Sequence, residues 1–427
     1  MTLPKVFFTD MRCKPGDSLP SKLDRLIRAA GIGSIDMEGK LVAIQMHFGE
    51  YGNLAFLRPN YAKVVADVVR EKGGTPFLTD CNTLYVGSRR NAVDHLECAS
   101  LNGFNPTTTG CQIIIGDGLK GTDDVEIPID GELVRTAKIG RAIADSDVLI
   151  TLTHFKGHAT TGIGGAIKNL AMGCASRRGK KELHIDGIPE VDSDGCIGCG
   201  RCVSACGEGS VSVSDGRAVI DKGTCVGCRR CIGACPRKAL CSVKDRDGRL
   251  VDAKMVEYAA AVTRDRPCFH ISIICDVSPF CDCAAWNDIP IVPNVGMLSS
   301  FDPVALDRAC VDLVQRQPVI PGSRAYVNSG GTKPDDVFGC SQPGTRWQNH
   351  FEHAARMGLG DGSYELVEVR RVDTRRARDR DAAVLHGGLA HVHRQALEVE
   401  DRQGDEPGVH GHHRAGLSVR DRQQARV

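Results

Sequence analysis

The stretch CIGCGRCVSACGEGSVSVSDGRAVIDKGTCVGCRRCIGAC, residues 196–235, holds eight of the 20 cysteines of the chain in two runs. Each run has the spacing C-x2-C-x2-C-x3-C, and the copies also match between the cysteines, CIGCGRCVSAC against CVGCRRCIGAC. Thiolates at this spacing wrap around an iron–sulfur cube, and small Gly and Ala residues let the backbone come close to it. The doubled run therefore predicts two [4Fe-4S] clusters.

In such doubled runs the fourth cysteine of each copy ligates the other cluster, as in two-cluster bacterial ferredoxins. Two zinc sites or four disulfides are the alternatives, and the doubled motif disfavours both. Between the runs, SVSVSDGRAVID alternates around Asp215-Gly216, which predicts a hairpin with a type I′ turn. A ferredoxin-like module over residues 191–244 is too small to fold readily without its clusters. The predicted ligands are Cys196, Cys199, Cys202 and Cys235 for one cluster, and Cys225, Cys228, Cys231 and Cys206 for the other.

The composition narrows the class of protein. Lys+Arg number 54 and Asp+Glu 53 in 427 residues, whereas a dedicated nucleic-acid binder should carry a basic excess. The first residues lack the apolar core of a signal peptide, and the longest apolar runs are strand-sized, so no membrane span is expected. Many cysteines without an export signal indicate metal ligation in a reducing compartment. We therefore expect a cytoplasmic protein that binds neither nucleic acid nor membrane.

Outside the cysteine runs, apolar segments alternate with amphipathic ones. This alternation predicts an α/β fold, with an open and mostly parallel sheet flanked by helices. Asn60 and Asp302 are expected to cap two of the helices. The predicted strands are 41–47, 76–80, 111–115, 148–152, 268–275 and 364–369. The other predicted helices are 18–31, 89–102, 138–144, 251–263 and 348–357.

Residues 1–190 and 245–369 are thus expected to form one α/β domain that carries the module 191–244 as an insertion. The remainder, 370–427, is rich in arginine but lacks lysine, cysteine and any hydrophobic period. Such a segment cannot bury enough apolar surface to order itself. We interpret it as disordered or non-native, for example out-of-frame translation; a functional basic arm is the alternative.

Several stretches resemble one known family: HFGEYGNLAFLRPNY (47–61), PFLTDCNTLYVGSRRNAVDH (76–95), THFKGHATTGIGGAIKNLAMGCASRRGKKELH (153–184), CDCAAWNDIPIVPNVGMLSSFDPVALDRACVDLV (281–314) and GLGDGSYELVEV (358–369). It is the family of uncharacterised iron–sulfur centre proteins, domain of unknown function 362. The resemblance implies an α/β domain with an inserted two-cluster ferredoxin and carries over the eight cluster cysteines. It implies no settled reaction or substrate.

A second candidate site follows the apolar strand 148–152. Ligands of open α/β sheets bind beyond the carboxyl ends of strands, and a glycine-rich turn that opens a helix offers N–H groups to an anion. The stretch fits neither a P-loop nor a Rossmann fingerprint, and a tight packing turn is the alternative. The candidate catalytic residues are His154, Lys156, His158 and Lys168, and the candidate residues for an unidentified anionic ligand are Gly162, Gly164, Gly165 and Asn169.

Two further groups are weaker candidates. Asp80, Cys81 and Asn82 end a predicted strand and precede Arg89 and Arg90, so they would line the same crevice or serve only as a turn. The spacing of the last group matches no standard zinc or ferredoxin motif, and buried strand cysteines are often plain core residues. That possible third metal site comprises His270, Cys275, Cys281 and Cys283.

The function predicted from these features is that of an oxidoreductase. The clusters would take single electrons from a redox partner and pass them to a substrate site in the α/β domain, because a carrier alone would not require so much additional chain. The alternatives are a non-catalytic electron-transfer subunit, a sensor or a maturation factor, or an anion-binding module whose clusters are structural.

Overall fold

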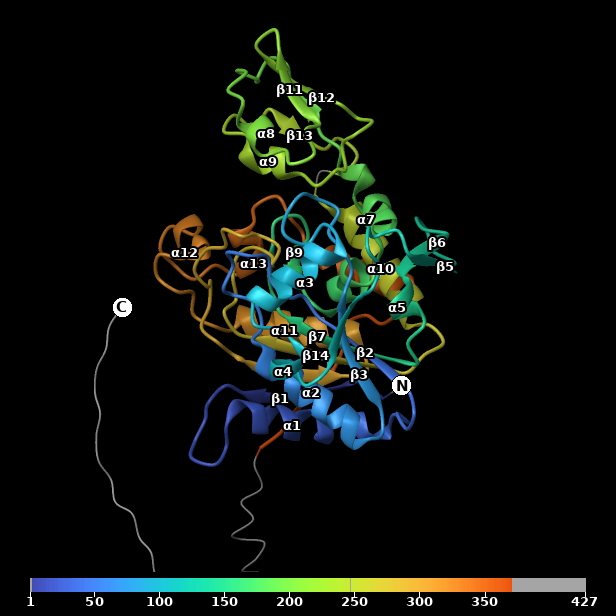
Figure 1. Cartoon of the computed structure of the whole chain (residues 1–427). Coiled ribbons are helices and arrows are strands. Elements are labelled where there is room, and N and C mark those ends of the chain that lie inside the picture. Colours follow the sequence, from blue (N-terminus) through green and yellow to red (C-terminus); the bar gives the residue numbers. More distant parts are fainter. Residues whose placement is uncertain (1, 246, 371–427) are drawn as a thin grey trace, which may run out of the picture. The chain divides into compact units, whose positions relative to one another are not determined.

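The computed structural model describes residues 2–245 and 247–370. Within them eight strands form one sheet, in the order β16-β1-β15-β14-β7-β2-β3-β4 (Figure 1). Seven of these strands share one direction and β15 opposes them, so the predicted mostly parallel sheet is confirmed. The strands are β1 (Lys5–Asp10), β2 (Leu41–Gln45), β3 (Thr75–Asp80), β4 (Gln112–Ile115), β7 (Val148–His154), β14 (Cys268–Ile274), β15 (Gly296–Ser300) and β16 (Glu365–Glu368).

The sheet separates two hydrophobic cores. Because successive side chains of a strand point to opposite faces, Val42 and Ile44 of β2 enter one core and Ala43 enters the other. Helices cover both faces, which is why the central strands are apolar on both sides. The longer helices are α1 (Leu19–Ala29), α2 (Pro59–Glu71), α3 (Ala92–Leu101), α10 (Arg249–Thr263), α11 (Pro303–Gln315) and α14 (Gln348–Arg356).

Three details of the predicted helices change. Arg58, not Asn60, is the N-cap of α2, because Pro59 has the backbone angle that suits the first helical position. Helix α3 begins after Asn91, whose side chain accepts from the N–H groups of residues 93 and 94. The segment 138–144 is divided between β6 (Thr136–Gly140) and the short α5 (Arg141–Ala144). The cap at Asp302 is confirmed, since its Oδ1 accepts from Val304 N at 2.8 Å.

Residues 190–241 form a group of short elements with their own small apolar cluster around Val211 and Leu240 (Figure 1). The predicted hairpin is present, and Asp215 and Gly216 both have positive φ, +50° and +70°, as a type I′ turn requires. The elements are β10 (Glu190–Val191), α8 (Arg201–Ser204), β11 (Val211–Ser214), β12 (Arg217–Ile220), α9 (Arg230–Ala234) and β13 (Leu240–Cys241).

No helix within residues 2–245 and 247–370 is both long enough and apolar enough to cross a membrane. The predicted disordered or non-native tail, 370–427, lies outside the described residues from 371 onward.

Candidate functional site

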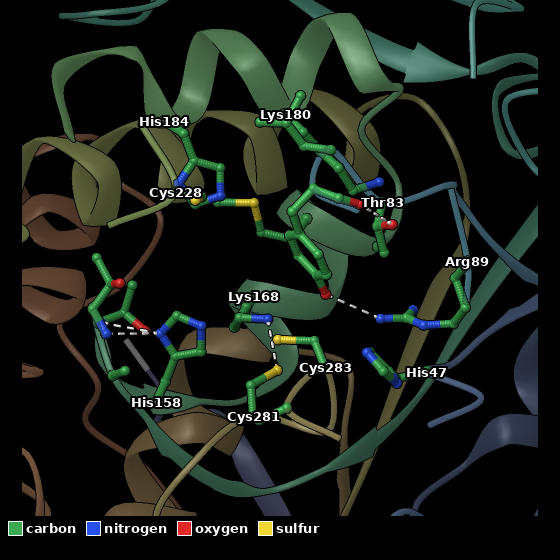
Figure 2. Close-up of a pocket in the computed structure, with 18 of the residues that line it drawn as sticks. His47, Thr83, Arg89, His158, Lys168, Lys180, His184, Cys228, Cys281 and Cys283 are labelled. Carbon is green, nitrogen blue, oxygen red and sulfur yellow. Dashed lines mark hydrogen bonds between the residues drawn. The ribbon is translucent and has the colours of Figure 1, made fainter. Parts of the chain in front are cut away.

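A pocket of about 190 Å³ opens where four neighbouring parallel strands end. It is lined by Gln45 at the end of β2, Asp80 at the end of β3, and segments that follow β7 and β14. Loops at the carboxyl ends of parallel strands converge on one edge of the sheet, where ligands of such folds bind. The predicted site residues His158, Lys168, Cys281 and Cys283 line this pocket (Figure 2). Asn169 lines it as well.

The pocket has an excess of positive charge. Its lining contains four Lys and Arg side chains against the single carboxylate of Asp80, whose pKa burial raises to about 6. Burial lowers the pKa of His158 and of His184 to about 3, so both rings are neutral near pH 7. The Nδ1 atom of His158 accepts from the N–H groups of residues 160 and 161, which leaves Nε2 as the protonated nitrogen. The four cations are Arg89, Lys168, Lys180 and Arg230.

Lys168 and two cysteines form the reactive part of the pocket. The Nζ of Lys168 donates to Cys281 Sγ at 3.3 Å (Figure 2). A hydrogen bond from Cys283 and the charge of Lys168 together lower the pKa of the Cys281 thiol well below its usual value, against the effect of burial. Burial alone would lower the pKa of Lys168, but the negative charge at Cys281 raises it. Both effects favour the thiolate of Cys281, which is the nucleophilic form of cysteine.

His154 and Lys156 lie behind the pocket wall and do not line it. The Nδ1 of His154 is 2.8 Å from Asp282 Oδ1, and Lys156 Nζ is 3.4 Å from Asp282 Oδ2. Nε2 of His154 is 2.7 Å from the carbonyl oxygen of Cys275, so both ring nitrogens face oxygen atoms of the chain. These residues, predicted as catalytic, instead anchor the residue between the two pocket cysteines.

The glycine-rich turn does not provide the predicted anion site. Gly162 and Gly164 belong to β9 (Gly162–Gly164), which pairs with β8 (Lys156–His158). The N–H groups of Ala166 and Ile167, which open the next helix, donate to the Asp307 carboxylate at 2.7 and 3.0 Å. A carboxylate of this chain thus occupies the position predicted for a ligand. Gly165 leaves room for it, because a Cβ there would lie 2.3 Å from Asp307 Oδ1.

Asn169 does reach the pocket, although not as part of a glycine-rich anion site. It begins η2 (Asn169–Gly173), one turn of π-helix, and its Nδ2 donates to Thr153 Oγ1 at 3.0 Å. Single π-helical turns are frequent at functional sites, because they shift which side chains face inward.

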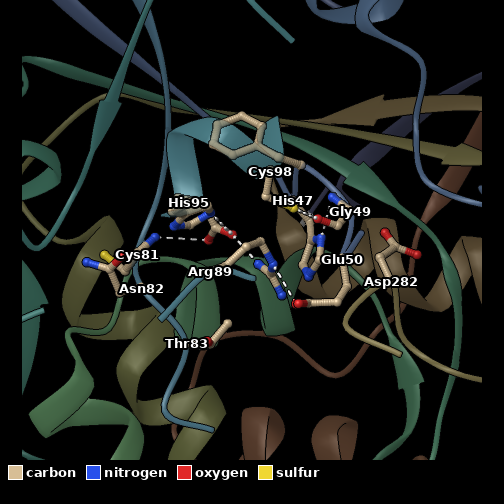
Figure 3. A network of polar contacts seen from close by, with 12 residues as sticks. His47, Gly49, Glu50, Cys81, Asn82, Thr83, Arg89, His95, Cys98 and Asp282 are labelled. Atoms are coloured by element: carbon tan, nitrogen blue, oxygen red, sulfur yellow. Dashed lines mark hydrogen bonds and ion pairs between the residues drawn. The ribbon is translucent and has the colours of Figure 1, made fainter. Parts of the chain in front are cut away.

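The second wall is built on a buried arginine. Arg89 donates to Glu50 Oε2 at 3.0 Å (Figure 3). It also donates to Asp80 Oδ2 at 3.1 Å and to the Tyr85 hydroxyl at 3.2 Å. Two carboxylates and one guanidinium removed from water are tolerated only when they are well paired. Of the residues around this strand end, Asp80, Cys81 and Arg89 line the pocket, while Asn82 donates to Asp117 and serves the turn.

The possible third metal site is not assembled. His270 lies in the middle of β14, with its Nδ1 3.0 Å from Thr151 Oγ1, whereas Cys281 and Cys283 line the pocket. Within residues 2–245 and 247–370, no three His, Cys, Asp or Glu side chains are grouped to hold a single metal ion. His270 and Cys275 are buried parts of the sheet and its end, and only Cys281 and Cys283 of the predicted four come together.

The cysteines of the two runs line two other small cavities, one for each predicted set of four. The fourth cysteine of each run lies with the first three of the other run. A cube-shaped cluster spreads its thiolates more widely than a zinc ion does with Zn–S bonds of about 2.3 Å, so the absence of a single-ion site does not conflict with such a cluster. One cavity is lined by Cys196, Cys199, Cys202 and Cys235, the other by Cys206, Cys225, Cys228 and Cys231.

Matching backbone turns in the two runs produce this grouping. Gly198 and Gly227 occupy the same position in each run, with φ of +61° and +70°. A Cβ at Gly198 would lie 2.4 Å from the Gly216 carbonyl oxygen, and one at Gly227 would lie 2.1 Å from that of His184. Only glycine therefore allows the chain to pass here, and both runs turn in the same way.

The pocket and the second cavity share a wall. Cys228, Tyr85 and Arg230 line both of them, and the Arg230 guanidinium lies 4.2 Å from the centroid of the Tyr85 ring. The pocket residues that were not predicted from the motifs include Tyr85, Arg230, Lys180 and His184. Lys180 and His184 lie four residues apart on α7 (Arg177–His184), a spacing that places two side chains on one helix face and was visible in the sequence.

Comparison with known proteins gives a family without an assigned activity. A thylakoid-associated protein of Synechocystis sp. is 26% identical over 174 residues, which is 40% of this chain and 50% of the relative, so the chain spans about half of that protein. The lactate racemase apoprotein of Thermoanaerobacterium thermosaccharolyticum aligns with 60% of this chain and 49% of its own, at 12% identity and a TM-score of 0.29.

A protein of Thermotoga maritima aligns with 70% of this chain and 59% of its own, at 10% identity and a TM-score of 0.38. Neither TM-score is high enough to establish a common fold. The family model for a domain of unknown function, DUF362, matches residues 42–312, which include the sheet strands β2 to β15, both cysteine runs and the pocket. This chain therefore belongs to the DUF362 family.

Proposed function

We propose that this protein is an iron–sulfur electron-transfer protein that binds two [4Fe-4S] clusters and delivers single electrons to an anionic substrate or cofactor in its α/β pocket. Cys196, Cys199, Cys202 and Cys235 would hold one cluster; Cys206, Cys225, Cys228 and Cys231 would hold the other. When bound, such clusters exchange one electron at a time with a redox partner.

One observation carries this proposal: the eight cysteines are sorted into two groups of four, and each group lines its own cavity. Each group contains three cysteines of one run and the fourth cysteine of the other, which is the arrangement that the two-cluster spacing predicts. Local chemistry also fits, since the N–H of Ala218 points at Cys196 Sγ at 3.4 Å, and hydrogen bonds to cysteine sulfur tune iron–sulfur centres. All eight thiols are free to act as ligands.

The pocket supports the choice of acceptor. Four cationic side chains converge there and the histidines are neutral, so a small anion is the ligand that this lining favours. Lys168 and Arg230 would orient it, and the apolar side chains of Phe280 and Trp286 would limit its access to water. Cys228 belongs to both the pocket and the second cavity, so an acceptor bound here lies beside a predicted cluster ligand.

The test is anaerobic purification of the full chain, followed by iron and sulfide analysis and a reductive titration followed by electron paramagnetic resonance. We expect about eight irons and about eight sulfides per chain, and a reversible one-electron signal. About four irons, or zinc in place of iron, contradicts two-cluster binding. Clusters that are reduced only as the protein unfolds contradict electron transfer and leave a structural role for the clusters.

A further inference from the structure

Cys281 and Cys283 belong to a single tight turn at the pocket. The N–H of Ala284 donates to the carbonyl oxygen of Cys281 at 2.9 Å, so the two cysteines are the first and third residues of a β-turn. Two residues separated by only one other lie at most about 7 Å apart at Cα, and a turn brings them closer, which places the two cysteine Cα atoms within the range that a disulfide spans. Both thiols are free and line the same cavity.

Asp282, the residue between the two cysteines, is fixed by contacts of both its side chain and its backbone. Asp282 is fully buried and its carboxylate faces His154 and Lys156. Its carbonyl oxygen accepts from Glu50 N at 2.9 Å and from Asn53 Nδ2 at 3.2 Å. A buried pair of charged groups, Asp282 and Lys156, is expensive in desolvation, and hydrophobic residues would fill the space at less cost. What the arrangement does achieve is a fixed turn with both thiols facing the pocket.

The surroundings of the thiols suit exchange chemistry. Lys168 donates to Cys281 Sγ, and Cys283 lines the same pocket beside Cys281. Disulfides form and break by attack of a thiolate on sulfur, so a stabilised thiolate beside a second thiol is the required pair. The low pKa of the Cys281 thiol agrees with this geometry.

We propose that Cys281 and Cys283 are a redox-active pair that cycles between dithiol and disulfide and reduces a small anionic disulfide bound in the pocket. Regeneration of the pair takes two electrons and one proton: the S–S bond breaks, Cys283 becomes a thiol and Cys281 a thiolate paired with Lys168. This inference rests on the proposed function, because the two electrons would come one at a time from the clusters that Cys228 and the other seven cysteines would hold.

The substrate half-reaction balances in the same way. The Cys281 thiolate attacks one sulfur of the substrate disulfide and expels the other sulfur as a thiolate. Cys283 then gives its proton to the expelled thiolate and attacks Cys281 Sγ in the mixed disulfide, which releases the second thiolate and forms the Cys281–Cys283 bond. The excess of cations in the pocket selects a substrate with carboxylate or similar groups.

The test uses the anaerobically purified, iron-loaded full chain. The reduced protein is treated with dithiodiglycolate, a small anionic disulfide, or with bis(2-hydroxyethyl) disulfide, its neutral counterpart. Free thiols are then alkylated and the chain is cut with chymotrypsin, which cleaves after Phe280 and Trp286 and releases the peptide CDCAAW with only these two cysteines. Its mass shows whether the pair is alkylated or disulfide-bonded, independently of any activity.

We expect the anionic reagent to oxidise the pair at least about tenfold faster than the neutral one, the effect of one charge-assisted contact. Reduced methyl viologen should regenerate the dithiol in iron-loaded protein but not in chelator-treated, iron-free protein. Cys283→Ser should retain the reagent on Cys281 as a mixed disulfide, and Cys281→Ser should not react. Both variants should keep the full iron content.

Three results separate the possibilities. If the peptide stays fully alkylated in iron-loaded protein, the redox pair is overturned and two-cluster binding stands. If the pair oxidises but viologen regenerates it equally fast without iron, its link to the clusters is overturned. If the purified protein contains no iron, the proposed function fails first, and the inference fails with it.

Discussion

At the scale of single residues, the pocket is governed by one ion pair, that of Lys168 with Cys281. A lysine on its own would make an anion site, and a cysteine on its own would be a small buried apolar residue. Together at 3.3 Å they stabilise each other's charged form. This contact favours the nucleophilic form of Cys281, and the reactivity of the Cys281 thiol measures how strongly Lys168 acts on it.

Replacing Lys168 with methionine should make Cys281 less reactive at neutral pH. The charge of Lys168 lowers the pKa of Cys281, so its removal raises that pKa and moves the pH profile of alkylation upward. At a pH below the pKa, the thiolate fraction and hence the labelling rate fall about tenfold for every increase of the pKa by about one. The measurement is the rate of iodoacetamide labelling of the peptide 281–286 as a function of pH.

Lys180→Met is the matched control, because Lys180 also lines the pocket but its Nζ donates to the carbonyl oxygen of Ala175. It should leave the labelling profile of Cys281 in place, and Lys168→Arg should largely restore it. Equal rates for wild type and Lys168→Met would show that Lys168 does not hold the thiolate.

At the scale of elements, the two cysteine runs work because the backbone turns left-handed at matching positions. Gly198 and Gly227 are one such pair, and Gly200 and Arg229 are the next, with φ of +71° and +62°. The second pair tolerates a side chain, as Arg229 demonstrates. At the first pair a carbonyl oxygen blocks the Cβ position, so the restriction there is contact as well as backbone angle.

Gly227→Ala and Gly200→Ala therefore form a matched comparison. Both residues have φ near +70°, so the intrinsic strain of about 1–2 kcal/mol is shared. Only at Gly227 would the new methyl group lie 2.1 Å from the His184 carbonyl oxygen, whereas at Gly200 nothing lies within 4 Å. We expect Gly200→Ala to keep its iron and Gly227→Ala to lose at least one cluster.

The readouts are iron per chain and the melting temperature under anaerobic conditions. If both variants keep all their iron, the close approach of the module to α7 at His184 does not support the clusters. If both lose it equally, backbone strain alone is decisive.

At the scale of the whole described unit, Arg89 and its neighbour Arg90 connect different parts. Arg89 joins the segment after β2, through Glu50, to the end of β3, through Asp80. Arg90 reaches the cysteine-rich module instead, with its Nη2 3.1 Å from Glu208 Oε2. The first arginine is fully buried, while the side chain of the second is 41% exposed, so adjacent residues make two kinds of ion pair.

Their substitution should separate the two contributions to stability. Arg89→Met leaves two buried carboxylates without their partner, which typically costs about 3–5 kcal/mol. Arg90→Met removes a partly exposed pair, worth about 0–1 kcal/mol. Urea unfolding of the α/β fluorescence signal, with iron content measured in parallel, tests both. A loss below about 1 kcal/mol for Arg89→Met would mean that water already reaches this network.

The sequence by itself determined the features that depend on local pattern. The alternation of apolar segments determined the mostly parallel sheet, because burial on both faces requires continuous apolar strands. The repeat of C-x2-C-x2-C-x3-C determined the grouping of eight cysteines, because the same spacing produces the same backbone turns in both runs. Asp302 and the Asp215-Gly216 turn were equally predictable, since each depends on its own few residues.

Only the tertiary structure decided which side chains face the pocket. The glycine-rich turn looked like an anion site, yet Asp307, from a helix far along the chain, occupies it. Cys281 and Cys283 looked like metal ligands with His270, yet they meet Lys168, which lies in a short helix after β7. Such pairings join residues more than a hundred positions apart, so no local period or spacing records them; they are set by the order of the strands in the sheet.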